Sequence, residues 1–330
     1  YNNINLRIKG SQMKNKLIAI FKELNYNNVS LFDMLQTDHG DSPYHKEGSI
    51  LTHLEMVYNK AVELYPDDKD LHIACFLHDV GKPFCKFFDT QANKTRFNGH
   101  ESFSVFVALD VLNKLDIDIN KERILKLIQR HADPYKYSLK NLKKLYNKET
   151  YKDVIKIHTC DSLGRMPEKQ PVIYDINVFR DDFDIPVHDK KISLMVGPQC
   201  SGKSTYLKYY ANVVSRDEII ELMFPKLNYN EAFKQADQDL VNKCFEVMLQ
   251  KYYKDCNYIV VDKMHLTVKS RRYNLKAMYD TNTIVIGLKT LLERNYNRKG
   301  KQINKDIIFD ALKRFQFVYP GELIIDNIIF

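Results

Sequence analysis

A glycine-rich stretch in the second half of the chain has the residue types and spacing needed to hold phosphate groups. Residues 197–205 fit G-x-x-x-x-G-K-[ST]. Glycine lets the backbone turn its N–H groups towards phosphate oxygens. Lys203 is expected to reach the β- and γ-phosphates, and the Ser204 hydroxyl to bind Mg²⁺. The residues predicted to hold the nucleotide are Gly197, Gln199, Cys200, Ser201, Gly202, Lys203, Ser204 and Thr205.

The segments on either side of this loop are suited to position it. Residues 192–196 have the apolar character of a short buried strand, and residues 206–211 can continue a helix. A strand–loop–helix order places the helix N-terminus beneath the phosphates. The sequence therefore predicts a site for ATP, or another nucleoside triphosphate, with Mg²⁺.

Two carboxylates follow predicted strands of the same region. Asp217 comes after a second strand, where it can accept a proton from an incoming hydroxyl, although it can equally be a helix N-cap. Asp262 closes the apolar strand 257–262 and is expected to bind metal or to position the substrate. Arg294 and Arg298 share one face of a helix, which is either a solvated basic face or a lid over triphosphate oxygens.

Histidines and aspartates are grouped in the first half of the chain. His53 lies on an amphipathic segment, His78 and Asp79 are adjacent, and Asp161 lies on a later segment. A single histidine on an apolar face is usually a core residue. A buried aspartate without a partner costs several kcal/mol, on the order of 3 or more, and a bound cation removes that cost.

The hydrophobic periodicity divides the chain into two fold classes. Residues 14–174 show helical spacing without strand-like alternation, whereas short apolar strands alternate with helices from about residue 192. We therefore predict an all-α domain followed by an α/β domain with a parallel sheet. The expected boundaries are possible leader residues at 1–12, an all-α domain at 13–180, a linker at 181–190 and the α/β domain at 191–330.

The composition sets mild limits on partners and location. The 330 residues carry a formal net charge of +8, which suits a polyanionic partner and equally a lysine-rich surface. The six cysteines are scattered without a C-x-x-C pair, which favours reduced thiols in the cytoplasm. No apolar run is long enough to suggest a membrane helix, and we expect no membrane partner.

The pattern H…HD…D over about residues 45–170 resembles the HD phosphohydrolase superfamily. The resemblance implies two divalent metals, with His53, His78, Asp79 and Asp161 at one, with Asp79, His100 and His131 at the other, and with Asp79 bridging them. Mixed imidazole and carboxylate donors suit Mn²⁺, Ni²⁺, Co²⁺ or Zn²⁺ better than Mg²⁺ alone. Such a pair activates water and stabilises the leaving oxygen of a phosphoester, while Lys82 is suited to hold a phosphate oxygen. His39, His45, His72, His158 and His188 are expected to be structural or surface residues.

Residues 190–330 resemble the 5′-hydroxyl polynucleotide kinases of RNA repair. The resemblance implies that Asp217 is the general base, that Asp262 opens a substrate-positioning segment, and that Arg294, Arg298 and Gly300 belong to the lid. Ile220 stands where that family usually has an arginine for the acceptor phosphate. Arg271 or Arg272 is expected to substitute for that arginine.

The two halves in this order resemble the bifunctional HD-Pnk end-healing enzymes. The resemblance implies phosphorylation of 5′-hydroxyl ends of RNA or DNA, hydrolysis of 2′,3′-cyclic and 2′(3′)-phosphate ends, and a separate RNA ligase as the functional partner. Two alternatives stay open: a nucleotidase with a nucleoside kinase acting on mononucleotides, and a regulatory protein that senses nucleotides.

Overall fold

The computed structural model describes residues 2–39, 47–165 and 183–330, with side chains from residue 11 onward. The chain forms two compact units: residues 1–182 with 287–289, and residues 183–286 with 290–330. Most of the predicted linker, residues 183–190, contains no helix or strand. His45, the end of the predicted first domain and the start of the linker lie outside the described residues.

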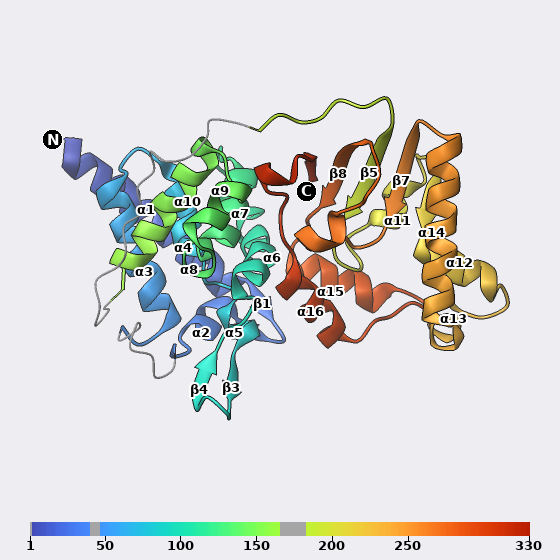
Figure 1. The fold of residues 1–330 in the computed structure, drawn as a ribbon. Helices are drawn as coiled ribbons and strands as arrows, with labels where there is room; N and C mark the ends of the chain where they lie inside the picture. The colour runs from blue at the N-terminus through green and yellow to red at the C-terminus, as the bar shows by residue number, and fades with distance from the viewer. Residues whose placement is uncertain (1, 40–46, 166–182) are drawn as a thin grey trace. The chain divides into compact units, whose positions relative to one another are not determined.

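The first unit is built almost entirely of helices, as predicted (Figure 1). Polar side chains begin several of them by accepting a hydrogen bond from the first turn, as Ser49 does for α3 and Asp68 for α4. The helices are α1 (Asn2–Glu23), α2 (Leu31–Leu35), α3 (Ile50–Leu64), α4 (Lys69–Leu77), α5 (Lys82–Cys85), α6 (His100–Leu112), α7 (Lys121–Arg130), α8 (Asp133–Lys136), α9 (Leu139–Leu145) and α10 (Lys148–Leu163).

The core of this unit follows the predicted helical spacing. Apolar residues recur at helical spacing from position 51 to position 64 of the sequence. On α3 those at Leu51, Leu54, Val57, Tyr58 and Ala61 are buried, whereas the last, at position 64, is exposed. Helices α3 and α4 contact each other, and α4 also contacts α7 and α10. The four helices thereby bring together residues that are far apart in the sequence.

The expectation of no strands in this region was wrong for two short hairpins. One joins β1 (Asn25–Tyr26) to β2 (Val29–Ser30), and the other joins β3 (Phe87–Asp89) to β4 (Lys94–Arg96). In the first, both turn residues, Asn27 and Asn28, have left-handed φ angles of 52° and 66°. Strands of two or three residues are too short to show the alternation on which the prediction relied.

The second unit is an α/β fold with one five-stranded parallel sheet (Figure 1). Its strand order is β6-β7-β5-β8-β9, so the first strand in sequence lies in the middle. Ligands bind beyond the carboxyl ends of such strands, where successive connections leave on opposite sides of the first strand. The strands are β5 (Lys191–Val196), β6 (Val213–Ser215), β7 (Tyr258–Asp262), β8 (Met278–Ile284) and β9 (Ile325–Ile329).

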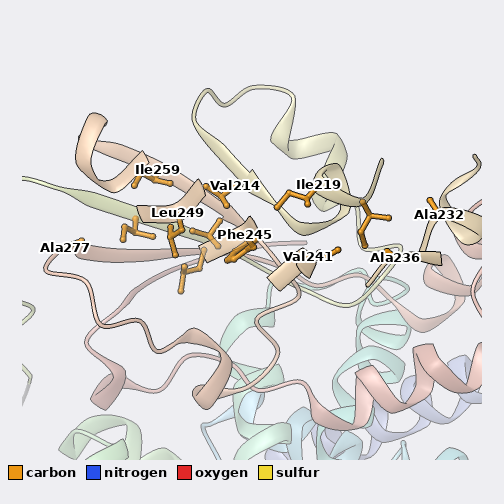
Figure 2. Close-up of a cluster of buried hydrophobic side chains, with 13 residues drawn as sticks. Val214, Ile219, Ala232, Ala236, Val241, Phe245, Leu249, Ile259 and Ala277 are labelled. Carbon is orange, nitrogen blue, oxygen red and sulfur yellow. The ribbon is translucent and has the colours of Figure 1, made fainter. Parts of the chain in front are cut away.

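Helices cover both faces of this sheet, because strands β5 and β7 are apolar on both sides. Figure 2 shows one face, where Phe245 and Leu249 of one helix pack against Val214 and Ile259 of the strands. Met195 and Val260 point to the opposite face. The helices of this unit are α11 (Lys203–Leu207), α12 (Arg216–Met223), α13 (Tyr229–Gln235), α14 (Gln238–Asp255), α15 (Leu288–Asn297) and α16 (Lys305–Arg314), with 3₁₀ turns η1 (Val268–Arg271) and η2 (Pro320–Glu322).

The apolar runs at 283–287 and 323–325 also predict strands, and the structure places both strands differently. Strand β8 occupies 278–284 rather than 283–287, because its buried polar side chains find partners within the sheet. Asn282 donates to Ser193 at 2.8 Å, and the Thr281 and Thr283 hydroxyls both reach Asp326 at 2.7 Å. Strand β9 begins at position 325, where a strand over 323–325 was expected. Among the described residues, no helix is both long and apolar enough to cross a membrane.

Candidate functional sites

The glycine-rich loop lies between β5 and α11, as its motif predicts. Three of its residues have positive φ: 151° at Gly197, 66° at Cys200 and 111° at Gly202. A Cβ on Gly197 would lie 2.8 Å from the Ser201 hydroxyl and 2.9 Å from the Ile284 carbonyl oxygen, so the close turn also requires glycine. This backbone begins α11 at the carboxyl edge of the sheet, where a phosphate is expected to bind.

Polar atoms of this loop are arranged for a ligand. The Lys203 ammonium donates to the carbonyl oxygens of Gly197 and Pro198 at 2.9 and 2.8 Å, which curls the side chain over the loop. Burial lowers the pKa of Lys203, and the Asp262 carboxylate opposes that shift. Two buried oxygens, Ser201 Oγ and Gln199 Oε1, have no hydrogen-bond partner among the described residues. Ser204 and Thr205 are exposed at the start of α11.

Both predicted lid arginines lie against this loop. Arg294 on α15 donates to the Ser201 carbonyl oxygen at 2.8 Å. The Arg298 guanidinium, just beyond α15, lies 3.4 Å from Cys200 Sγ. Two guanidinium groups beside a phosphate-binding loop can neutralise a triphosphate. This arrangement supports the lid interpretation over that of a solvated basic face.

Asp217 lies in the first turn of α12, but Ser215 is the residue that caps this helix. The Ser215 hydroxyl accepts from the Glu218 N–H at 3.4 Å, which argues against Asp217 as the N-cap. Asp217 is exposed, and its Oδ1 accepts a hydrogen bond of 2.6 Å from the Tyr229 hydroxyl. Tyr229 is a further candidate for the site that sequence reasoning missed, because nothing near it in the sequence marks it.

Asp262 lies at the end of β7, where Ser215 is its partner on β6. The Ser215 hydroxyl donates to Asp262 Oδ2 at 3.0 Å. Burial raises the pKa of Asp262, while Lys203 and this hydrogen bond act in the opposite direction. Asp262 therefore belongs to the same electrostatic cluster as the phosphate-binding lysine.

These residues line one open pocket of about 1580 Å³. Small-molecule sites occupy about 300–1,000 Å³, so this pocket has room for more than a nucleotide. Phe233, which is 43% exposed, and Lys234 belong to the wall beside Asp217. The predicted residues that line the pocket are Gln199, Cys200, Ser201, Gly202, Lys203, Ser204, Thr205, Asp217, Asp262, Arg294 and Arg298.

The suggestion that Arg271 substitutes for the missing arginine does not fit its surroundings. Its side chain is buried and forms a bidentate ion pair with Glu322, with N–O distances of 2.9 and 2.7 Å. It also donates to the carbonyl oxygens of His265 and Gln316, so its role is structural. Arg272 is exposed but is not among the residues that line the pocket.

Ile220 itself is fully buried in the core of the second unit, on the inner face of α12. A side chain at that position cannot reach the pocket without leaving the core. The acceptor contact that the resemblance to polynucleotide kinases implies therefore has no equivalent at this position of the chain.

The six histidine and aspartate residues predicted to bind metal meet in one cluster of the first unit. His53 Nε2 lies 3.2 Å from His78 Nε2 and 3.2 Å from Asp161 Oδ1. Asp79 Oδ2 lies 3.5 Å from His53 Nε2 and 3.3 Å from His78 Nε2. These four donors come from α3, the end of α4 and α10, and they surround a space suited to one cation.

The second oxygen of Asp79 faces the other two histidines. Asp79 Oδ1 lies 3.1 Å from His100 Nε2 and 3.8 Å from His131 Nε2. The two oxygens of Asp79 face different imidazole pairs, so both candidate metal positions have Asp79 beside them. Both triads, His53–His78–Asp79 and Asp79–His100–His131, place their ligand atoms within 4.8 Å of one another.

Three of the imidazoles are oriented by the backbone in the same way. Nδ1 of His78, His100 and His131 lies 2.7–2.8 Å from the carbonyl oxygen three residues earlier. In that contact Nδ1 carries the proton and donates a hydrogen bond to the carbonyl oxygen. Nε2 therefore keeps its lone pair, which is directed into the cluster and can bind a metal. Metal-binding histidines are held in this tautomer by such partners.

The charges of the cluster also favour a cation. Burial lowers the pKa of His78, but the Asp79 and Asp161 carboxylates outweigh it and raise that pKa to about 10. Burial lowers the pKa of His131 to about 3. The carboxylates thus require positive charge at the centre, which a divalent ion supplies. Lys82 Nζ lies 2.5 Å from Asp79 Oδ2, at the edge where it can also meet a phosphate oxygen.

His39 and Glu47 belong to this site, although the sequence analysis assigned His39 a structural role. Glu47 Oε1 lies 3.0 Å from His53 Nδ1, and the His39 ring packs edge-on against the His53 ring with centroids 5.2 Å apart. Glu47 therefore places a carboxylate oxygen beside Nδ1 of His53, the ring position beside which backbone carbonyl oxygens lie in the other three imidazoles. Neither residue lies in a pattern that sequence reasoning could have used.

Comparison with known protein families agrees with this division. Residues 50–166 match the family described as HD domain, and residues 192–320 match the family described as AAA domain. A search of the curated proteins finds none that matches the chain. The predicted fusion of an HD domain with a P-loop kinase-like domain is confirmed. These two domains are suited to phosphohydrolase and kinase activity, with divalent metal and nucleotide as the expected cofactors.

Proposed function

We propose that this protein heals RNA ends, with one activity in each unit. The second unit phosphorylates a 5′-hydroxyl end from a nucleoside triphosphate. The first unit hydrolyses a 2′,3′-cyclic phosphate and then the resulting 2′- or 3′-phosphate. The single observation that carries the proposal is the second unit's pocket, in which the phosphate-binding loop, both lid arginines and an exposed Asp217 share a space larger than a nucleotide requires.

For the kinase step, the residues provide positioning and charge neutralisation, which is what phosphoryl transfer needs. Lys203, Arg294 and Arg298 hold the triphosphate, and Ser204 would bind the Mg²⁺ that offsets its charge. Asp217 accepts the proton of the attacking 5′-hydroxyl while the Tyr229 hydroxyl holds Asp217 Oδ1 in place. Phe233 and Lys234 offer an aromatic and a basic group to the acceptor strand.

For the hydrolytic step, His53, His78, Asp79 and Asp161 would hold one divalent ion, and Asp79, His100 and His131 the other. When bound, such ions supply an activated water and charge for the leaving oxygen. Lys82 is placed to bind a nonbridging phosphate oxygen. The products of both steps, a 5′-phosphate and a 3′-terminal hydroxyl, are the ends that a separate RNA ligase joins.

The test uses one RNA oligonucleotide that carries a 5′-hydroxyl and a 2′,3′-cyclic phosphate. It is incubated with the protein, ATP, Mg²⁺ and Mn²⁺ or Ni²⁺, and both ends are then resolved. The expected result is a gain of the 5′-phosphate and loss of the terminal phosphate at the other end. An equivalent DNA and a panel of triphosphates define acceptor and donor preference.

The same assay with free nucleosides and nucleoside cyclic phosphates separates the proposal from its main alternative. Reaction of mononucleotides without change at either RNA end would replace RNA healing with nucleotide metabolism. Absence of turnover with every acceptor, despite triphosphate binding, would favour a nucleotide-sensing protein.

A further inference from the structure

An aromatic ring lies exposed immediately beyond a candidate metal ligand of the first unit. Tyr135 is on the short helix α8, four residues after His131, and 54% of it is exposed. Its neighbours Ala132, Asp133 and Pro134 are buried. Lys136 of the same helix is exposed as well, so it is the position of Tyr135 beside His131, rather than its exposure alone, that makes the ring a candidate to contact a ligand.

The ring is held in a fixed orientation. The Tyr135 hydroxyl lies 2.6 Å from the Ser162 hydroxyl, and its ring packs on His158 with centroids 4.3 Å apart and an interplanar angle of 59°. A pre-positioned ring loses little conformational freedom when another flat group stacks on it.

Arg165 connects this ring to the metal cluster. Its Nη2 lies 2.6 Å from Asp161 Oδ2 and also bonds to the Tyr135 hydroxyl, while its Nε donates to the Asp161 carbonyl oxygen at 3.1 Å. Asp161 Oδ1 is thereby left to face His53. The Arg165 guanidinium thus bridges the exposed Tyr135 side chain and Asp161, which is one of the candidate metal ligands.

We propose that Tyr135 stacks on the nucleobase of the terminal nucleotide whose phosphate is hydrolysed by the first unit, and that Arg165 is a positioning residue that orients both Tyr135 and Asp161. The inference rests on the proposed hydrolytic function and names its substrate-binding group. In a terminal ribose the base on C1′ and the phosphate on O2′ or O3′ project from opposite faces of the sugar, so the ring and the metal cluster would each contact a different group. RNA-binding proteins recognise unstacked terminal bases on aromatic rings, and every base offers a face for stacking.

The kinetic test compares Tyr135→Ala and Tyr135→Phe with the unaltered protein. One substrate is an RNA with a 2′,3′-cyclic phosphate end, and the other has the same phosphate on a terminal 1-deoxyribose that lacks the base. Loss of one base–aromatic stack should raise KM for the first substrate roughly 5- to 150-fold, with kcat little changed. Tyr135→Phe keeps the ring and should stay within about threefold of the unaltered protein.

A matched control removes another exposed ring of the same unit. Phe88 on β3 is 58% exposed and lies outside the metal cluster, so Phe88→Ala should leave both KM values unchanged. For Tyr135→Ala, the substrate that lacks the base is an internal control of folding, because its KM should not change. Equal loss on both substrates, or no change on either, would overturn the stacking role.

A second measurement does not depend on turnover. RNA ending in 5-iodouridine 3′-phosphate is irradiated with the protein, and the cross-linked peptide is identified by mass spectrometry. Cross-linking at Tyr135 supports the proposal, whereas cross-linking only elsewhere contradicts it. If the unaltered protein hydrolyses nucleoside 2′,3′-cyclic phosphates but not RNA ends, RNA healing fails, and the effect of Tyr135→Ala on those nucleotides still decides the stacking.

Discussion

Single residues in both units gain their orientation from partners that lie outside their own helix. Asp217 is exposed and capable of binding a hydroxyl, and Tyr229 holds one of its oxygens from the next helix. His53 is likewise directed by Glu47, which lies outside the helix that carries the histidine. In each pair a reactive group depends on a second side chain for its orientation.

Removing the carboxylate of Asp217 should abolish most of the kinase activity. We expect Asp217→Asn to lower kcat by about 10²–10⁴, the usual contribution of a general base, with KM for ATP unchanged. Tyr229→Phe loses only the positioning hydrogen bond and should lower kcat by about tenfold, the value of roughly one such bond. Steady-state rates of 5′-phosphorylation test both, with cyclic phosphate hydrolysis as the control. A kinase unaffected by Asp217→Asn would exclude this residue as the base.

Loss of the Glu47 carboxylate should weaken metal binding at the cluster. Because the Glu47 carboxylate lies against His53, we expect Glu47→Ala to reduce metal affinity about 10–100-fold, and Glu47→Gln to reduce it less, since the amide keeps an oxygen of similar size beside the ring. Mn²⁺ titration followed by electron paramagnetic resonance measures this affinity directly. The control Glu55→Ala removes a half-buried carboxylate of α3 that faces Lys14 rather than the metal cluster, and it should have no effect on metal affinity. Equal affinity in Glu47→Ala and the unaltered protein would reject the positioning role.

At the scale of elements, charged side chains join the helices that carry the metal cluster. Asp68 caps α4 through the Leu71 N–H at 3.2 Å. Arg123 on α7 makes a bidentate contact to Asp68 at 2.6 and 2.8 Å and another to Asp153 on α10 at 2.7 and 3.0 Å. The network therefore connects three helices whose ends supply His78, His131 and Asp161.

This network should make stability depend on pH in a defined window. Burial raises the pKa of Asp68, but hydrogen bonds from Arg123 and the Leu71 N–H outweigh it and lower that pKa from 3.8 to about 2. A lowered carboxylate pKa contributes stability above 3.8 and loses it as the pH falls through about 2. The destabilisation by Asp68→Asn, which keeps a capping oxygen, should be constant from pH 7 to 5 and vanish near pH 2.

Thermal unfolding of the first unit, measured for both proteins between pH 7 and 2, checks this window. The free energy of unfolding should fall by about 1.5–3 kcal/mol in Asp68→Asn near neutral pH, the range for hydrogen bonds to charged groups. Asp67→Asn alters the neighbouring carboxylate and is the matched control. A stability difference that persists at pH 2 would show that the ion pair is not its source.

For the whole molecule, the two sites belong to separate compact units and are built from separate residues. The metal cluster lies within residues 39–165, and the nucleotide pocket within residues 199–330. No residue is shared between them. The two activities should therefore fail independently.

Complementation between variants tests this independence. Asp79→Ala removes the ligand common to both metals and should abolish only hydrolysis, whereas Asp217→Asn should abolish only phosphorylation. A mixture of the two variants should heal both ends of one RNA, because each end can react on a different molecule. Loss of both activities in either folded variant would contradict separate sites. Lys203→Ala, paired with Asp79→Ala, repeats the test through nucleotide binding instead of the general base.

Local residue patterns determined the chemistry of this protein and its division into two fold classes. The loop 197–205 was recognisable because its phosphate-binding geometry depends on consecutive backbone groups and two glycines. His78 and Asp79 were recognisable because they are adjacent, and the helical stripe of α3 because burial follows a period of 3.6 residues.

Only the tertiary structure decided how distant residues combine. It paired Glu47 with His53, Tyr229 with Asp217 and Arg165 with Tyr135, all contacts that arise when separate helices or loops pack together. It also buried Arg271 in an ion pair with Glu322, 51 positions away, and so removed it from the substrate site. The position of strand β8 was likewise not predictable from the sequence. Its polar residues are stable inside the sheet only because neighbouring strands supply their hydrogen-bond partners.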